Sequence, residues 1–230
     1  SVGLTNQPIM LLQAIFQALN VGTTALVARF TGMGQPDKAS DTLRQTFVVT
    51  ILLGLIISLF AGVAAPYILQ FMGDDQDRMP IGTPYFRVVA SGLVFNAAAM
   101  AIGSALRGAG DTRTPMAVNL LANGINVLFN WILIWGKFGF PRLEVLGAGI
   151  ATTLSRIVSC LLFIVIAVRG EKNIALDVSS RFKFDRQILS RIYKIGFPAA
   201  VEQMVLRSGQ IMFAKVISSL GTVTFAAHQV

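Results

Sequence analysis

Long apolar stretches separated by short polar segments dominate the chain. Turn-forming residues lie between the stretches, as in the run from Gly32 to Pro36 and the run from Gly108 to Pro115. Six stretches are each about as long as the roughly 20 residues that a membrane-spanning helix needs; they are residues 8–30, 46–71, 84–105, 115–135, 147–168 and 196–217. A seventh begins near Thr222. The pattern predicts an all-α polytopic membrane protein with six transmembrane helices and the start of a seventh.

The composition supports a membrane protein and excludes a soluble domain. Hydrophobic residues make up 54% of the chain and charged residues only 13%, whereas soluble domains carry about 25% charged residues. The net charge of +8 raises the question of nucleic-acid binding. The basic residues lie between the apolar stretches, as in the loops of membrane proteins, so we expect the lipid bilayer and not nucleic acid as the partner.

The distribution of basic residues predicts the orientation. The loops after the first, third and fifth stretches, with their flanks, contain twelve Lys and Arg residues, whereas those after the second and fourth contain four. The positive-inside rule therefore places the first set in the cytoplasm. The longest of these loops, between Arg169 and Ile195, alternates basic residues with apolar ones, which predicts an amphipathic helix on the membrane surface or, alternatively, a solvated linker.

Polar residues inside the stretches recur at helical spacing. The fourth stretch places four amides at positions i, i+4, i+7 and i+11, which share one face of a helix: Asn119, Asn123, Asn126 and Asn130. The first, third and fifth stretches carry similar polar or small-residue faces: Gln13, Gln17, Asn20 and Thr24; Gly92, Asn96, Ala99 and Gly103; and Thr152, Ser155, Arg156 and Ser159. Unsatisfied amides are costly in hydrocarbon. These faces therefore either bond helices together or line a water-accessible cavity; for stripes this long we favour the cavity.

The sixth stretch carries charges at depth: Glu202, Gln203, Arg207 and Gln210. Charged residues inside a membrane are costly and often functional. A buried carboxylate such as Glu202 can hold or release a proton as its surroundings change, which is the chemistry of a proton-coupled carrier. The alternative is a static ion pair of Glu202 with Arg207 or Arg156. Arg156 has a further alternative, a hydrogen bond to backbone carbonyls.

Enzyme and metal chemistry find little support in the sequence. One cysteine, Cys160, and one histidine, His228, cannot form a disulfide framework or a Cys/His metal cluster within this chain. The sequence contains no HExxH motif and no nucleophile–base arrangement at membrane depth. We therefore predict a protein that is not an enzyme and needs no cofactor.

Several sequence runs together resemble the multidrug and toxic compound extrusion (MATE) family. The most characteristic is the Gly-rich run from Ala105 to Pro115, followed by the Asn-rich stretch. Four supporting runs occur in the family's order: residues 27–30 with Gly32 and Gly34, residues 147–152, residues 196–198 with Glu202 and Gln203, and residues 226–229. The resemblance implies a transporter of twelve helices in two six-helix lobes, which works by alternating access.

On the family template this chain covers helices two to seven and the start of eight. The resemblance then assigns residues 1–170 to the rest of the N-terminal lobe, 171–195 to the cytoplasmic inter-lobe linker and 196–230 to the start of the C-terminal lobe. Both ends of the sequence look cut, so we expect a piece of a longer protein. That protein is expected to be a monomer that crosses the cytoplasmic (inner) membrane several times.

The resemblance also assigns site residues. In relatives, the amides corresponding to Asn126 and Asn130 form a cation site beside an acidic residue of the first helix, so these two are the candidate Na⁺ ligands here, and no firmer metal site is predicted. Some members carry the C-lobe carboxylate at the position of Leu206, whereas this chain has Glu202. We assign Glu202, Asn126 and Asn130 to the cation or proton pathway. The expected cavity lining is Gln13, Gln17, Asn20, Asn119, Asn123, Gln203, Arg207 and Gln210.

The expected function is export of organic, often cationic, amphiphilic small molecules by antiport with H⁺ or Na⁺. Two alternatives stay open. A flippase of the same superfamily would move lipid-linked sugars and would carry more cationic residues toward its cavity, as Arg156 and Arg207 suggest. A membrane-embedded enzyme is the weaker alternative.

Overall fold

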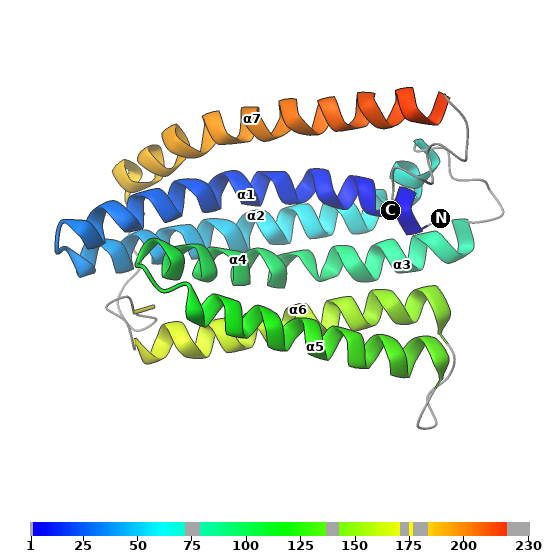
Figure 1. The fold of residues 1–230 in the computed structure, drawn as a ribbon, viewed down its shortest axis with the longest axis horizontal. Helices are drawn as coiled ribbons and strands as arrows, with labels where there is room; N and C mark the ends of the chain where they lie inside the picture. The colour runs from blue at the N-terminus through cyan, green and yellow to red at the C-terminus, as the bar shows by residue number, and fades with distance from the viewer. Residues whose placement is uncertain (1, 72–78, 137–142, 171–174, 177–183, 220–230) are drawn as a thin grey trace.

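The protein folds into long helices that lie side by side (Figure 1). The computed structural model describes residues 2–71, 79–136, 143–170, 175–176 and 184–219. Within these ranges no strand is formed, and the helices are α1 (Val2–Gly32), α2 (Pro36–Phe71), α3 (Met79–Ser91), α4 (Leu93–Gly108), α5 (Arg113–Trp135), α6 (Glu144–Arg169) and α7 (Arg186–Ser219). In Figure 1, α7 lies at one edge and packs on α1, while the α5–α6 pair lies at the opposite edge. The all-α prediction is confirmed.

Four segments are long and apolar enough to cross a membrane: Pro36–Tyr67, Gly82–Gly108, Arg113–Trp135 and Glu144–Arg169. The first and sixth predicted spans also lie in helices, α1 and α7, of 31 and 34 residues. Large apolar side chains point outward from the spans, and Leu59, Val63 and Leu120 are each at least 69% exposed. Such a surface suits lipid and not water. The seventh predicted span, from Thr222, lies outside the described residues.

The third predicted span consists of two helices in line, α3 and α4, with a break at Gly92. Backbone groups released at a break within a membrane must find other partners. Side chains of neighbouring helices supply hydrogen bonds to three consecutive carbonyls before the break: Thr153 Oγ1 to Val88 (2.9 Å), Arg156 Nη1 to Val89 (3.1 Å) and Ser58 Oγ to Ala90 (2.8 Å). The break is therefore held by α2 and α6.

Glycines allow α1 to pack closely against two other helices. A Cβ atom at Gly22 on α1 would overlap the backbone carbonyl of Ile192 on α7, and one at Gly196 on α7 would overlap that of Ala18 on α1. On the α4 side, a Cβ at Gly108 would lie 2.6 Å from the carbonyl oxygen of Thr24 on α1. Small residues at such crossings let backbones approach where lipid provides no hydrophobic driving force. These contacts fix α1 between α4 and α7.

The Gly-rich run after α4 forms a tight turn that is fixed by one glycine conformation and two hydrogen bonds. Gly110 has φ +88°, a backbone conformation that favours glycine. The backbone N–H of Asp111 donates to the Leu106 carbonyl (2.9 Å), and Asp111 Oδ1 accepts from the backbone N–H of Thr114 (3.1 Å). The turn thus ends α4, and the Asp111 side chain accepts one of the backbone N–H groups of the first turn of α5.

Helix α7 begins ten residues before the predicted boundary at residue 196. Asp185 Oδ1 accepts hydrogen bonds from the backbone N–H groups of Gln187 (2.8 Å) and Ile188 (3.3 Å), which is N-cap geometry. Ile188 and Ile192 are buried. The part of the amphipathic pattern over 186–195 therefore lies in the first turns of α7, which continues into the predicted sixth span. Residues 177–183 lie outside the described part, so the predicted linker and lobe boundaries remain predictions.

Candidate functional site

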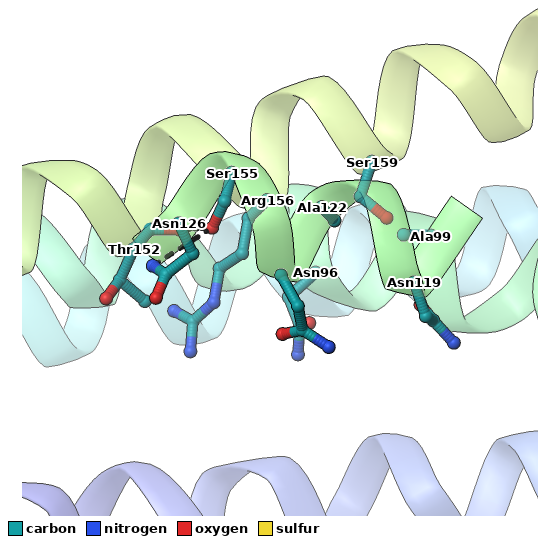
Figure 2. Close-up of a pocket in the computed structure, with 10 residues that line it drawn as sticks. Asn96, Ala99, Asn119, Ala122, Asn126, Thr152, Ser155, Arg156 and Ser159 are labelled. Carbon is teal, nitrogen blue, oxygen red and sulfur yellow. Dashed lines mark hydrogen bonds between the residues drawn. The ribbon is translucent and has the colours of Figure 1, made fainter. Parts of the chain in front are cut away.

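The polar faces of α4, α5 and α6 meet around a cavity of about 430 Å³, which we call the amide cavity. Figure 2 shows Asn96, Asn119 and Arg156 pointing toward its open side. The lining residues are Asn96, Ala99, Asn119, Ala122, Asn123, Asn126, Thr152, Ser155, Arg156 and Ser159. Three of the four polar stripes predicted from the sequence therefore converge on one space, as a cavity lining requires.

A short hydrogen-bond chain holds the amides in place. Asn130 Nδ2 donates to Asn126 Oδ1 (2.9 Å), and Asn126 Nδ2 donates to Ser155 Oγ (3.4 Å). Ser155 Oγ donates in turn to the Thr152 carbonyl (2.9 Å). The buried Oδ1 of Asn130 has no hydrogen-bond partner among the described residues. The amides thus connect α5 to α6, as the packing alternative predicts, and at the same time line a cavity.

Arg156 carries the charge of the amide cavity. Its Nη1 donates to the Val89 carbonyl at the helix break (3.1 Å), which confirms the predicted alternative of a bond to a backbone carbonyl. Among the residues that line the cavity in the described structure, none carries a carboxylate. The side chain is half-buried and lies close to the middle of α6.

A second polar cavity, of about 550 Å³, lies where α1 faces α4 and α7. Its lining is Gln17, Asn20, Val21, Thr24, Ala25, Ala28, Met100, Arg107 and Gln203. Ser104 Oγ donates to Asn20 Oδ1 (3.3 Å), and Thr24 Oγ1 donates to the Ser104 carbonyl (3.0 Å). Asn20 Nδ2 is buried and has no partner among the described residues. We call this space the second cavity.

Most of the predicted site residues line one of the two cavities. Asn119, Asn123 and Asn126 line the amide cavity, with Asn130 hydrogen-bonded to its wall. Gln17, Asn20 and Gln203 line the second cavity. Gln13 is half-buried on α1 but lines neither.

The polar cluster of the sixth span is divided as well. Glu202 is exposed on α7 and lines neither cavity, whereas its neighbour Gln203 lines the second. The side chains of Arg207 and Gln210 lie outside the described part. The described structure therefore does not bring Glu202 together with Asn126 and Asn130.

Sequence reasoning missed Met100 and Arg107 of α4 among the lining residues of the second cavity, together with Val21, Ala25 and Ala28 of α1. The signal was present, because Asn96, Met100, Gly103 and Arg107 recur at helical spacing along α4. It also missed an apolar cavity of about 250 Å³ between α1, α2 and α7, lined by Ile15, Ala18, Leu19, Leu53, Ile192, Tyr193, Gly196, Phe197, Ala200 and Met204.

Comparison with known proteins identifies the family. The family model described as MatE matches residues 1–132, more than half of the chain. The chain belongs to the MatE family. Curated relatives include a probable multidrug resistance protein NorM of Thermotoga maritima, 32% identical over 100% of this chain and 49% of its own length. The uncharacterized transporter YisQ of Bacillus subtilis is 29% identical over 96% of this chain and 48% of its length.

Solved MATE structures share the fold. An outward-facing MATE transporter of the MOP superfamily superimposes with a TM-score of 0.88 at 25% identity, covering 99% of this chain and 50% of its own. A MATE structure in complex with MaD3S gives 0.89 at 25% identity, covering 99% and 51%. MATE transporters are two-lobed with twelve helices. The chain spans about half the length of the curated relatives it matches. It is a multi-pass helical membrane protein of a transporter family.

Proposed function

We propose that the protein exports organic, often cationic, amphiphilic compounds across the cytoplasmic membrane by antiport with H⁺ or Na⁺. The amide cavity carries this proposal, because polar side chains from α4, α5 and α6 line an open cavity of about 430 Å³ within otherwise apolar helices. Pockets of about 300–1,000 Å³ are usual for drug-sized ligands. The multidrug-resistance names of the curated relatives agree with this substrate class.

The proposed mechanism is competition between cation and substrate for the polar interior, coupled to alternating access. In this mechanism Asn126 and Asn130 bind the coupling cation. Amide oxygens are neutral ligands that suit Na⁺ or a hydronium ion. The Oδ1 of Asn130, which has no hydrogen-bond partner among the described residues, is an acceptor available for that role. Gln17, Asn20 and Gln203 extend the polar path through the second cavity. We propose that the transporter works as a monomer.

Glu202 is proposed to take up and release the coupling proton. Transport of a cationic dye by the protein as the cell makes it, reconstituted in liposomes, tests this role with H⁺ and Na⁺ gradients imposed separately. Glu202→Gln is expected to lower proton-driven efflux at least about tenfold, because the amide cannot ionise. Asp41→Asn, an exposed carboxylate on α2, is the matched control and should keep wild-type efflux. Unchanged proton-driven efflux in Glu202→Gln would remove Glu202 from the pathway.

A lipid-linked-sugar flippase of the same superfamily is the second candidate. Two arginines favour it, because Arg156 lines the amide cavity and Arg107 lines the second cavity. A solved MOP superfamily transporter from Pyrococcus furiosus, 25% identical with a TM-score of 0.84, is described as having a binding pocket whose reverse polarity suggests a different function. Translocation of a fluorescent lipid-linked sugar in the same liposomes, without dye efflux, would favour the flippase.

A further inference from the structure

Pro66 interrupts the backbone hydrogen bonds of α2 within its last turns. Proline has no backbone N–H, so the carbonyl four residues earlier, that of Gly62, loses its usual donor inside the helix. The side chain of Arg87 on α3 replaces this donor, because its Nε donates to the Gly62 carbonyl at 3.2 Å. The interruption in α2 is therefore supported by α3.

The break between α3 and α4 is supported in the opposite direction, from α2. Ser58 Oγ on α2 donates to the Ala90 carbonyl of α3, two residues before the break, at 2.8 Å. The two helices run antiparallel here, since Ser58 meets Ala90 and Gly62 meets Arg87. Each helix thus supplies a side chain that satisfies a backbone carbonyl where the other helix is interrupted.

Apolar packing joins the same helix ends. Ala61 of α2 and Phe86 and Ala90 of α3 are fully buried in one apolar cluster. On the other side of the break α2 packs on α4, because a Cβ at Gly54 would lie 3.1 Å from Val94 Cα. Helix α2 is therefore packed against α4 before the break and against α3 after it.

Two side chains of α6 connect the break to the amide cavity. Thr153 Oγ1 donates to the Val88 carbonyl (2.9 Å), and Arg156 Nη1 donates to the Val89 carbonyl (3.1 Å). Arg156 also lines the amide cavity, where Figure 2 shows its side chain. A tilt of α3 at the break therefore moves the carbonyl that holds a side chain of the cavity wall.

We propose that the interruption at Pro66 and the break at Gly92 act as one hinge, on which α3 and the last turns of α2 tilt together during transport. Ser58 and Arg87 are the positioning residues of this hinge, because each joins one helix to the interrupted part of the other. Hinges are formed by a few positions that absorb the backbone change between packed elements. Arg156 transmits the tilt to the amide cavity. The part of the hinge in transport rests on the export function proposed above, whereas the hinge itself does not.

Hydrogen exchange, measured by mass spectrometry on the protein as the cell makes it in nanodiscs, tests whether the two helix ends open together. Ser58→Ala removes the donor to the Ala90 carbonyl of α3, and Arg87→Met removes the donor to the Gly62 carbonyl of α2. With one hinge, each variant speeds exchange about threefold to tenfold in α3 and in the last turns of α2, while α5 keeps wild-type exchange. Faster exchange confined to the helix that lost its donor, or no change in either helix, would overturn the hinge.

Matched controls separate this coupling from the loss of any hydroxyl or charge. The Ser91 hydroxyl bonds within α3, to the Val88 carbonyl at 2.7 Å, so Ser91→Ala should leave exchange in α2 unchanged. Arg169→Met removes a charge from the last turn of α6 and should leave both helix ends unchanged. Ser58→Thr keeps the donor and should exchange as the wild type does.

A second variant keeps the test decisive if Arg87→Met does not fold, as judged by size-exclusion chromatography. Ser58→Ala then decides alone, because the donor that it removes serves α3 and not α2. Faster exchange in both helices supports the hinge, and faster exchange in α3 alone overturns it.

Efflux of a cationic dye from liposomes tests the part of the hinge in transport. Ser58→Ala and Arg87→Met should lower the maximal rate about threefold or more and change the half-saturating dye concentration less than about twofold, since neither residue lines the amide cavity or the second cavity in the described structure. Unchanged efflux in both variants would overturn this part. Joint exchange of the two helix ends without any efflux by the wild type would refute export alone. Efflux by the wild type with exchange changes confined to one helix would refute the hinge alone.

Discussion

The two polar cavities differ in how their amides are held. In the amide cavity, Asn130, Asn126 and Ser155 form a continuous chain of hydrogen bonds between α5 and α6. In the second cavity, Asn20 accepts one bond from Ser104, but its buried Nδ2 has no partner among the described residues. Preorganised polar groups bind specifically because little reorganisation is required of them. Each cavity also keeps one buried amide atom without a partner among the described residues, Asn130 Oδ1 in the first and Asn20 Nδ2 in the second. Because its hydrogen bonds join two helices, we propose the amide cavity as the more selective site and the second cavity as a polar path.

The largest expected effect tests the selective role of the amide cavity. Asn126→Leu removes the amide that both accepts from Asn130 and donates to Ser155. Dye efflux from liposomes should fall at least about tenfold, because the proposed cation site and the wall of the cavity are lost together. Leu120→Ala, at a position that is 72% exposed on the same helix, is the control and should keep efflux. Efflux retained in Asn126→Leu would place the selective site elsewhere.

An intermediate effect is expected where α1 meets α4 at the end of the second cavity. Gly108→Ala places a Cβ 2.6 Å from the Thr24 carbonyl oxygen and 3.0 Å from Val27 Cβ, so the helices must separate. Overpacking of this kind costs about 1–3 kcal/mol of stability, measured as a lower midpoint of thermal aggregation in detergent. Gly124→Ala on α5, where a Cβ meets nothing within 4 Å, should be neutral or stabilising. An equal change in the aggregation midpoint of the two variants would mean that α1 and α4 are not tightly packed at Gly108.

The smallest expected effect concerns Asn20. Replacing a buried, partly satisfied amide by an apolar side chain of similar shape is nearly neutral, so Asn20→Leu should change the stability by less than about 1 kcal/mol. Ser104 keeps its bond to the Ala101 carbonyl (2.8 Å). Asn130→Leu removes the bond to Asn126 and should cost more, about 1 kcal/mol or above. A loss of stability in Asn20→Leu as large as that in Asn130→Leu, in the same thermal measurement, would show that the second cavity is as tightly organised as the amide cavity.

The sequence predicted the helices and their polar faces because both are local properties. Long apolar runs gave the membrane-spanning segments, and helical spacing placed Asn119, Asn123 and Asn126 on the single face that lines the amide cavity. It also singled out the Gly-rich run that becomes the turn at Gly110. The residues that share a face follow from 3.6 residues per turn alone.

Other features depended on contacts far apart in the chain. The break at Gly92 is held by partners on α2 and α6, and α7 starts early because Asp185 caps it and Ile192 packs on α1. No local pattern specifies these. That Glu202 lines neither cavity has the same origin, since its surroundings are set by the packing of α7.

Helical periodicity by itself determined which side chains lie together on each helix. Only the tertiary structure decided which faces meet: one face of α4 contributes to both cavities, with Asn96 in the amide cavity and Met100 and Arg107 in the second cavity. The physical reason is the close approach at Gly22, Gly108 and Gly196, where backbone contacts between distant segments fix the rotation of each helix.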